Sequence, residues 1–262
     1  MKGVFRNIMN KTKKIRKRDL ASIYLRSFFM QAVWNFKSLL AAGFCYALIP
    51  AAKRLTNSED GTCAFLKKHL CFFNAHPYFA SYAVGAIIRL EEDLQAGIIK
   101  DEAQIGRFKN AMIGALGALG DQLFWAAVKP GAILLGLAGA AIFQDLELQI
   151  FSILAVLLVY NIPHLYIRTA GLLNGYAEGY AIVKHLKIEK FEKVKNLYLF
   201  IGAVMLGIFS GYTGSLYLSQ ENMPIFVFGL SIIIMLLIRR LKINWYLSVS
   251  IPICLALVLG LL

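Results

Sequence analysis

The sequence predicts an all-α integral membrane protein: a multi-span bundle with broken or re-entrant helices and interfacial amphipathic helices. Hydrophobic residues make up 58% of the 262 residues, and charged residues only 16%. The mean hydropathy of +0.62 is well above that of an ordinary soluble domain. The net charge of +13 is carried by basic residues between the apolar segments. It therefore indicates membrane topology and contact with anionic lipid, and not a nucleic-acid partner.

Basic residues and an amphipathic pattern mark the N-terminal part of the chain. Residues 1–18 form a basic tail, which the positive-inside rule keeps in the cytoplasm. Residues 19–262 contain no long linker and predict a single membrane domain. Within it, residues 20–52 mix apolar with scattered polar residues, a pattern typical of an amphipathic helix in the membrane interface.

The next segment, residues 69–88, has no Asp, Glu, Lys or Arg, but it contains Asn74, His76 and Pro77. We expect this segment to dip into the membrane as a kinked hairpin. Residues 89–109 are rich in charge and predict a cytoplasmic helix.

Residues 110–143 form a long apolar run with polar residues at its centre. A single span needs about 20 mostly apolar residues, so the run predicts a broken or re-entrant element. Ionisable side chains at bilayer depth usually face a cavity or a bundle interior, so Asp121 and Lys129 are site candidates. The glycines and the proline of the run are predicted to have structural or packing roles: Gly114, Gly117, Gly120 and Pro130.

Spans of alternating direction complete the predicted chain. The acidic link at residues 144–149 suits the outer face, and the basic segment 168–196 suits the cytoplasm. The predicted spans place the C-terminus outside the cytoplasm and cover residues 150–167, 197–218, 223–238 and 243–262.

Two further structural features are predicted in this region. Gly171, Gly175 and Gly179 recur every fourth residue, so on a helix they form a face that a second helix can approach closely. Asn161 and Pro163 lie near the inner end of a span, where a proline frees a backbone carbonyl that a polar group must satisfy.

Five polar residues are candidates for a solute path: Asn74, His76, Asp121, Gln122 and Lys129. The amide of Asn74 offers hydrogen-bond donors and an acceptor without a charge, which suits a hydroxyl-rich solute. Asp121 is equally consistent with capping a helix that begins just after it, and Gln122 with a hydrogen bond between helices. Lys129 is consistent with snorkelling to the surface or with pairing to Asp121. His76 is consistent with a turn residue satisfied by backbone.

No pattern for catalysis or metal binding is present in the sequence. It lacks a GxxxxGK[ST] phosphate loop and a GxSxG nucleophile elbow. Four histidines never pair with Cys, Asp or another His at metal-ligand spacing: His69, His76, His164 and His185. We therefore expect no catalytic residue, no metal and no cofactor in this chain.

Five segments occur in an order known from one family: RSFFMQAVWNFKSLLAAGFCYALIPAAKRL (26–55), HLCFFNAHPYFASYAVG (69–85), GALGALGDQLFWAAVKP (114–130), NIPHLYIRTAGLLNGYAEGY (161–180) and MPIFVFGLSIIIMLLIRR (223–240). From about residue 18 to its end, the chain resembles the IID subunit of bacterial phosphotransferase systems of the mannose/fructose/sorbose family. The most specific part is the GDQLFW core, with a basic residue and a proline after it.

The resemblance implies a sugar-permease subunit of the bacterial inner membrane that pairs with an obligate IIC subunit, often in trimers of IIC–IID pairs. Cytoplasmic IIA and IIB partners would relay phosphate from phosphoenolpyruvate, through phosphohistidine, to a mannose-type hexose. In this scheme the IID subunit carries no phosphorylated residue, so it is a transport subunit and not an enzyme by itself.

The chain departs from the common pattern of this family at five positions. Gln122 replaces a small hydroxyl residue and Lys129 replaces arginine. Ala32 and Val33 replace glycine and serine, and Ala75 replaces threonine.

Two alternatives to a sugar permease stay open from the sequence. One is a regulatory or scaffold subunit that keeps the fold and the partner but moves no sugar. The other is a membrane-embedded enzyme that uses Asp121 and His76 as acid and base.

Overall fold

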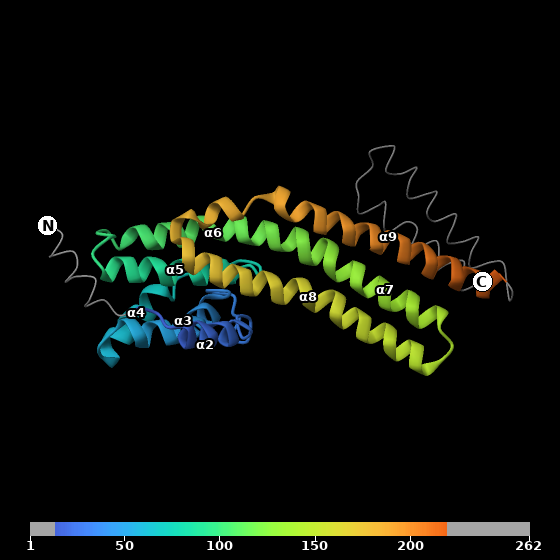
Figure 1. Ribbon diagram of the computed structural model, residues 1–262, viewed down its shortest axis with the longest axis horizontal. Coiled ribbons are helices and arrows are strands. Elements are labelled where there is room, and N and C mark those ends of the chain that lie inside the picture. The colour runs from blue at the N-terminus through green and yellow to red at the C-terminus, as the bar shows by residue number, and fades with distance from the viewer. Residues whose placement is uncertain (1–13, 219–262) are drawn as a thin grey trace. The chain divides into compact units, whose positions relative to one another are not determined.

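Helices make up most of the chain in the computed structural model, which describes residues 14–218 (Figure 1). Within these residues, extended backbone pairs only in isolated bridges, between Asn35 and Leu39 and between Leu39 and Phe73. The helical elements follow in this order: α2 (Lys17–Ser27), α3 (Ala41–Leu55), α4 (Glu59–His69), α5 (Ala80–Gln95), α6 (Ala103–Gly120), the π-helical segment η1 (Asp121–Val128), α7 (Lys129–Ile142), α8 (Leu146–Glu178), the 3₁₀ segment η2 (Gly179–His185) and α9 (Ile188–Leu218).

The chain divides into two compact units. Unit 1 comprises Met1–Ile133 and Leu154–Gly202, and unit 2 comprises Leu134–Ile153 and Ala203–Leu262. The boundaries fall within α7, α8 and α9, so each of these helices contributes residues to both units.

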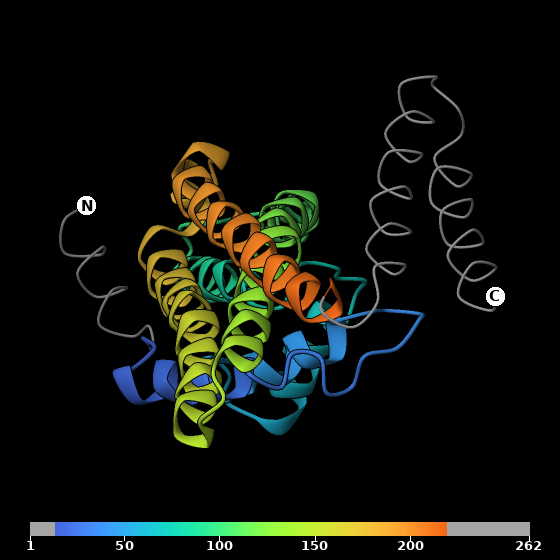
Figure 2. The ribbon, with the colours of Figure 1, turned by 90° about the vertical axis from the view of Figure 1, so that its right-hand side faces the viewer.

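Helix α5 is the centre of unit 1, since 12 of its 16 residues are buried. Helix α3 packs against α2, α4 and α5, and α5 also contacts α6. Figure 1 and Figure 2 show α2, α3 and α4 gathered on one side of α5. The buried face of α3 is rich in alanine, and such small residues let helices approach closely.

Residues 20–52 do not form the single interfacial helix that their pattern predicts. The irregular segment 28–40 separates α2 from α3, and α3 belongs to the buried core. In that segment, the Asn35 side chain accepts hydrogen bonds from the backbone N–H groups two and three residues later. Leu39 has a φ of 54°. Local side chain–backbone bonds compete with helix formation, and a positive φ is incompatible with a right-handed helix.

Two further predicted elements have different boundaries in the structure. Residues 69–88 form no hairpin: α4 ends, residues 70–79 are irregular, and α5 follows. Pro77 disfavours helix in the residue before it, which keeps this segment irregular. Residues 89–109 do not form one helix, because the chain turns after α5 at Gly97, whose φ is 72°.

The predicted break within residues 110–143 is absent. Helix α6, η1 and α7 follow one another without interruption, and Asp121 keeps helical backbone angles (φ −65°, ψ −43°). An open break at membrane depth would leave backbone groups unsatisfied, whereas a π-helical turn keeps them bonded. Pro130 is the second residue of α7, where its missing N–H removes one bond from the helical ladder just after η1.

Helix α8 is one unbroken helix, so the boundary predicted after its apolar half is absent. Pro163 lies inside it, and the missing N–H of this proline leaves the carbonyl of Val159 without its helical donor. The Tyr198 hydroxyl of α9 donates to that carbonyl at 2.6 Å. Asn161, in contrast, donates to the carbonyl of Leu157 at 2.7 Å. The group that satisfies the freed carbonyl is therefore Tyr198.

Glycines allow α8 and α5 to meet closely. A Cβ at Gly175 would lie 2.5 Å from the carbonyl oxygen of Tyr82, and one at Gly171 would overlap a side-chain oxygen of α5. Gly85 of α5 lies reciprocally against the backbone of α8. Gly179 differs from Gly171 and Gly175, because it directly follows the end of α8 and has a φ of 54°. A positive φ after a helix is typical of a C-terminal glycine.

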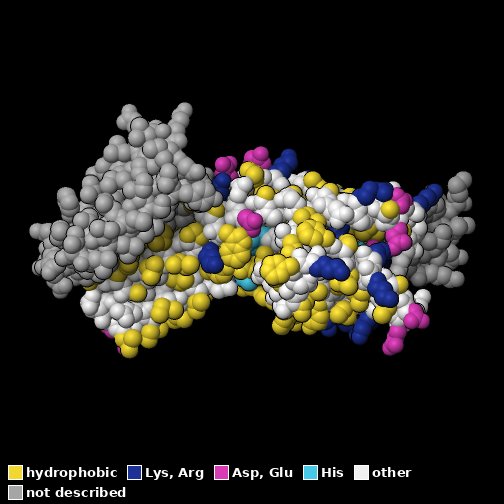
Figure 3. All heavy atoms as spheres, turned by 180° about the vertical axis from the view of Figure 1, so that it is seen from behind, with side chains coloured by type: hydrophobic (Ala, Val, Ile, Leu, Met, Phe, Trp, Pro, Cys, Tyr) yellow, Lys and Arg dark blue, Asp and Glu magenta, His cyan; other side chains and the backbone are white. Residues whose placement is uncertain are grey.

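Three helical stretches of the described chain are long and apolar enough to cross a membrane: Ala103–Ile142, Leu146–His185 and Ile188–Thr213. They confirm the all-α membrane fold class. Figure 3 shows lysine and arginine side chains over unit 1. Residues 134–153 and 203–218, the described part of unit 2, contain no lysine or arginine. The predicted spans at 223–238 and 243–262 lie outside the described residues.

Candidate functional site

A small polar pocket lies in unit 1, where the irregular segments 28–40 and 70–79 meet the helix face at the junction of α6 and η1. Its volume is about 170 Å³. It is lined by Gln31, Trp34, Leu40, Asn74, Ala75, His76, Pro77, Gly117, Asp121 and Trp125. The fold thus brings together three of the five candidate path residues, Asn74, His76 and Asp121.

Backbone hydrogen bonds hold the two irregular segments together. The N–H of Leu40 donates to the carbonyl of Phe73 at 2.9 Å, and the N–H of Phe73 donates to the carbonyl of Ser38 at 3.4 Å. The Phe73 ring is buried 4.5 Å from the ring of Phe44 in α3. These contacts fix the position of Asn74, the next residue along the chain.

A regular spacing brings the helical residues of the pocket together. Gly117, Asp121 and Trp125 are four residues apart, so they share one helix face. A Cβ at Gly117 would meet no atom within 4 Å, so this glycine widens the pocket. A Cβ at Gly114, which does not line the pocket, would likewise meet no atom within 4 Å. Neither glycine makes the close packing contact expected of it within the described chain.

Three side chains of the pocket have unused hydrogen-bonding capacity. Within the described residues, the side chains of Gln31, Asn74 and Asp121 are exposed and form no hydrogen bond or ion pair. Asp121 does not cap a helix, because it lies inside the helical run and its own N–H bonds to preceding carbonyls. Two amides and a carboxylate, in a pocket that Trp34 and Trp125 also line, suit a hydroxyl-rich solute.

The other two path candidates do not line this pocket. Gln122 borders a separate small recess beside Ile188 and Phe191. The Lys129 ammonium lies 4.8 Å from the centre of the Trp125 ring. Lys129 forms no ion pair with Asp121 in the part of the chain that the structure describes. It therefore contacts the ring of a pocket-lining residue without lining the pocket itself.

His76 forms the buried wall of the pocket. Its ring is stacked 5.1 Å from the ring of Phe124, and it is only 2% exposed. Its Nδ1 accepts a hydrogen bond from the N–H of Tyr78 at 3.3 Å, whereas its Nε2 is buried without a partner among the described residues. A Cβ added at Gly120 would overlap the His76 side chain. The segment 70–79 therefore packs directly on the helix backbone.

We expect Gly120→Ala and Gly117→Ala to have different effects. The first should destabilise the protein by roughly 1–3 kcal/mol, because the new methyl group overlaps His76 and forces a shift. The second should leave stability unchanged or slightly raised, because its methyl group meets open space in a helix. Thermal unfolding in detergent measures both variants. Equal melting temperatures would contradict the tight packing at Gly120.

The stability of the protein should fall in acid because of His76. Burial, with Arg168 and His164 nearby, lowers the pKa of His76 from 6.5 to about 3. The folded state thus resists protonation, so its stability is full above about pH 6.5 and declines as the pH falls toward 3. At pH 5 the loss should be about 2 kcal/mol. His76→Phe keeps a planar ring and should flatten the profile of melting temperature against pH; an unchanged profile would contradict this assignment.

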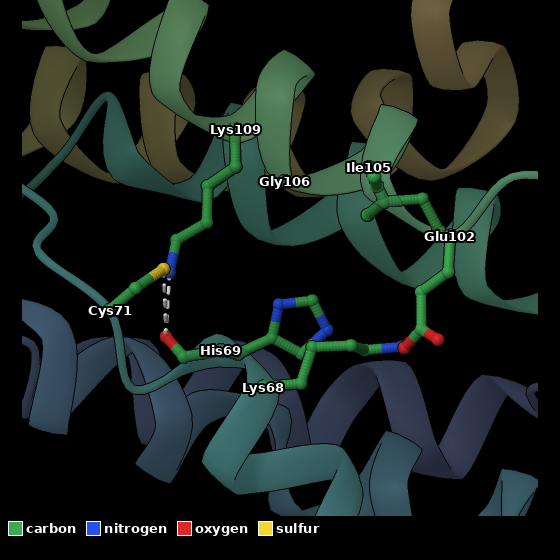
Figure 4. A pocket seen from close by; sticks show the side chains of 8 residues that line it. Lys68, His69, Cys71, Glu102, Ile105, Gly106 and Lys109 are labelled. Atoms are coloured by element: carbon green, nitrogen blue, oxygen red, sulfur yellow. Dashed lines mark hydrogen bonds and ion pairs between the residues drawn. The ribbon is translucent and has the colours of Figure 1, made fainter.

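A larger cavity of about 460 Å³ lies between the end of α4 and the start of α6 (Figure 4). Lys68 forms ion pairs with Glu91 at 2.8 Å and Glu102 at 2.7 Å, and His69 bonds to Glu91 at 3.1 Å. Burial raises the pKa of Glu91, but the bonds from His69 and Lys68 outweigh it and hold that pKa below its usual range. Lys109 donates to the carbonyl of His69 at 2.6 Å. The charged side chains of this cavity are therefore already partnered and join α4, α5 and α6.

Arg168 has a structural position that the sequence did not reveal. The residue is 2% exposed, and its guanidinium donates to the carbonyl of Ser27, the last residue of α2. It also lies 4.6 Å from the Phe28 ring and 5.3 Å from the Tyr78 ring. Arg168 therefore ties α8 to the start of the segment 28–40.

Gln31 and Trp34 are pocket residues that sequence reasoning missed as site candidates. The only local signal is a polar amide within an apolar stretch, which also fits the solvent face of an amphipathic helix.

The fold and the pocket define the class of the protein. It is a helical membrane protein with a small polar pocket of the kind that suits an uncharged, hydroxyl-rich solute. The model of the "PTS system mannose/fructose/sorbose family IID component" matches residues 14–221. The chain belongs to this family, which confirms the resemblance seen in its sequence.

Curated relatives whose names state a sugar specificity support the same family assignment. The chain is 32% identical over 198 residues to the mannose-specific EIID component of the Escherichia coli K12 phosphotransferase system, covering 75% of this chain and 66% of that protein. It is 33% identical over 202 residues to the sorbose-specific EIID component of Lacticaseibacillus casei, covering 77% and 68%. The chain thus spans about two thirds of the length of these curated relatives.

Two solved structures also support the family assignment. The chain is similar to a chain in the structure of the mannose transporter ManYZ in complex with microcin E492, with a TM-score of 0.58 and 32% identity over 74% of this chain and 70% of that one. A second structure, described as a membrane protein, has a TM-score of 0.64 and 30% identity over the same shares.

Proposed function

We propose that this chain is the IID subunit of a phosphoenolpyruvate-dependent sugar phosphotransferase system. With a IIC subunit it forms the translocation path for a mannose-type hexose. The observation that carries this proposal is the pocket in which Gln31, Asn74 and Asp121 present free hydrogen-bonding groups, and which Trp34 and Trp125 also line. Family membership and the mannose and sorbose specificities of its relatives support it.

The pocket accounts for only part of a sugar site. The hydroxyl groups of a hexose point outward around its whole ring, whereas these three side chains belong to one small pocket, and an unpaired polar group is costly where water is excluded. We therefore infer that a IIC subunit provides the remaining contacts. Similarity to a chain of the mannose transporter ManYZ supports a two-subunit path.

Phosphoryl transfer belongs to other subunits in this proposal. Cytoplasmic IIA and IIB proteins pass phosphate from phosphoenolpyruvate to the sugar as it arrives. This chain binds and positions the sugar and carries no phosphorylated residue.

Charge distribution supports an orientation in the bacterial inner membrane. The N-terminus lies in the cytoplasm with the basic residues that precede and begin α2, and the C-terminus lies outside. The acidic link between α7 and α8 faces outward. Pairs of IIC and IID associate into a higher oligomer.

Uptake measurements test the proposal. Membrane vesicles from cells that lack this chain should lose phosphoenolpyruvate-dependent uptake of mannose, fructose or sorbose, and re-expression should restore it. The chain should co-purify with a hydrophobic second subunit in mild detergent. A complex without uptake of any of the three sugars would favour the scaffold alternative. Activity of the chain purified alone would favour an enzyme.

A further inference from the structure

An apolar groove of about 420 Å³ lies in unit 1 between α2 and α8. It is lined by Lys17, Leu20, Ala21 and Tyr24 of α2 and by Thr169, Leu172 and Leu173 of α8. Most of this wall is hydrocarbon, and it shares no residue with the polar pocket. The groove therefore suits an apolar chain and not a sugar.

Positive charge gathers at the start of α2, where Lys17 lines the groove. Four exposed basic residues stand at the start of α2: Lys14, Arg16, Lys17 and Arg18. None of these four side chains forms an ion pair within residues 14–218. Arg54 reaches the same place, since its Nε donates to the carbonyl of Lys14 at 3.1 Å. Asp19, in the first turn of α2, accepts from the backbone N–H of Arg16 at 2.9 Å.

We propose that this groove is a binding site for one anionic phospholipid. An acyl chain packs between α2 and α8, and the lipid phosphate lies against the basic residues at the start of α2. The N-terminal end of the α2 dipole adds to their attraction for an anion. Basic pockets beside membrane helices are suited to anionic headgroups in this way.

The charge favours a lipid over a protein helix as the occupant. An apolar partner helix would cover the hydrocarbon wall equally well, but it would leave Lys17 and the unpaired cations beside it in the sequence without an anion. A phospholipid provides both an acyl chain for the groove and a phosphate for the basic residues. The proposal rests on the membrane location of this family and is independent of sugar transport.

Native mass spectrometry of the complex of this chain with its IIC partner tests the site. The complex is purified in neutral detergent and titrated with dioleoyl phosphatidylglycerol or dioleoyl phosphatidylcholine. We expect one phosphatidylglycerol per copy of this chain to be retained under conditions that remove phosphatidylcholine. Lys17→Glu should weaken its binding roughly tenfold, because each basic residue contributes appreciably to attraction of an anionic lipid.

Matched variants separate the groove from lipid that coats the whole protein. Leu173→Trp fills the groove and should also weaken phosphatidylglycerol binding, whereas Leu157→Trp changes an exposed α8 residue outside the groove and should not. Lys37→Glu is the control for charge reversal at an exposed lysine away from the groove. Equal retention by all four variants, or by both lipids, would overturn the proposal. Binding to this chain alone that disappears in the complex would identify a IIC helix as the occupant.

Discussion

Replacing Asp121 with asparagine should reduce sugar uptake roughly ten- to hundredfold while leaving the subunits assembled. The carboxylate lines the pocket and has no hydrogen bond or ion pair among the described residues, so it is free to accept from sugar hydroxyls. A hydrogen bond to a charged group contributes about 1.5–3 kcal/mol, which corresponds to that loss. Uptake in vesicles containing the whole phosphotransferase system measures the effect.

Two measurements distinguish a direct role of Asp121 in sugar binding from a role in the fold. Because Asp121 lies inside a continuous helix and caps nothing, the variant should co-purify with its partner in the usual amount. Asp60→Asn, at an exposed acid of α4, should leave uptake unchanged. Loss of assembly in Asp121→Asn would show that the carboxylate supports the fold and would contradict a role in the sugar path.

Replacing Gly175 with leucine should destabilise the protein more than any other single substitution considered above. Even a methyl group at this position would lie 2.5 Å from the carbonyl oxygen of Tyr82 and 2.8 Å from the backbone nitrogen of Ala86. These are backbone atoms of the buried helix α5, so relief requires the two helices to separate. We expect Gly175→Ala to cost at least about 1–3 kcal/mol, and Gly175→Leu to prevent accumulation of folded protein.

The control variant for this prediction should not lose stability. Gly114→Ala lies in α6, where the new methyl group meets no atom within 4 Å. Alanine is the better helix former, so this variant should be as stable as the unaltered chain or slightly more stable. The melting temperature and yield in detergent report both variants. A Gly175→Ala protein as stable as Gly114→Ala would show that α5 and α8 are not closely packed.

Sequence patterns predicted those features that depend on local composition. The hydropathy of the apolar runs predicted membrane-length helices, and the structure has them. The cost of polar groups in such runs pointed to Asp121 and to Asn74 and His76, which the fold brings to one pocket. Element boundaries were less predictable: the breaks expected near residues 121 and 167 are absent, because helix continuation satisfies backbone groups that a break would expose.

The sequence by itself determined that this is an all-α membrane protein of the phosphotransferase IID family, because hydropathy, charge and short motifs are properties of neighbouring residues. Only the tertiary structure decided which polar groups meet. Gln31 and Asn74 line the same pocket because the backbones of two irregular segments pair at Leu39 and Phe73. Lys129 lies over the ring of Trp125, and Arg168 is buried against the end of α2. These contacts join residues far apart in the chain or depend on helix geometry, and no local pattern specifies where such side chains find their partners.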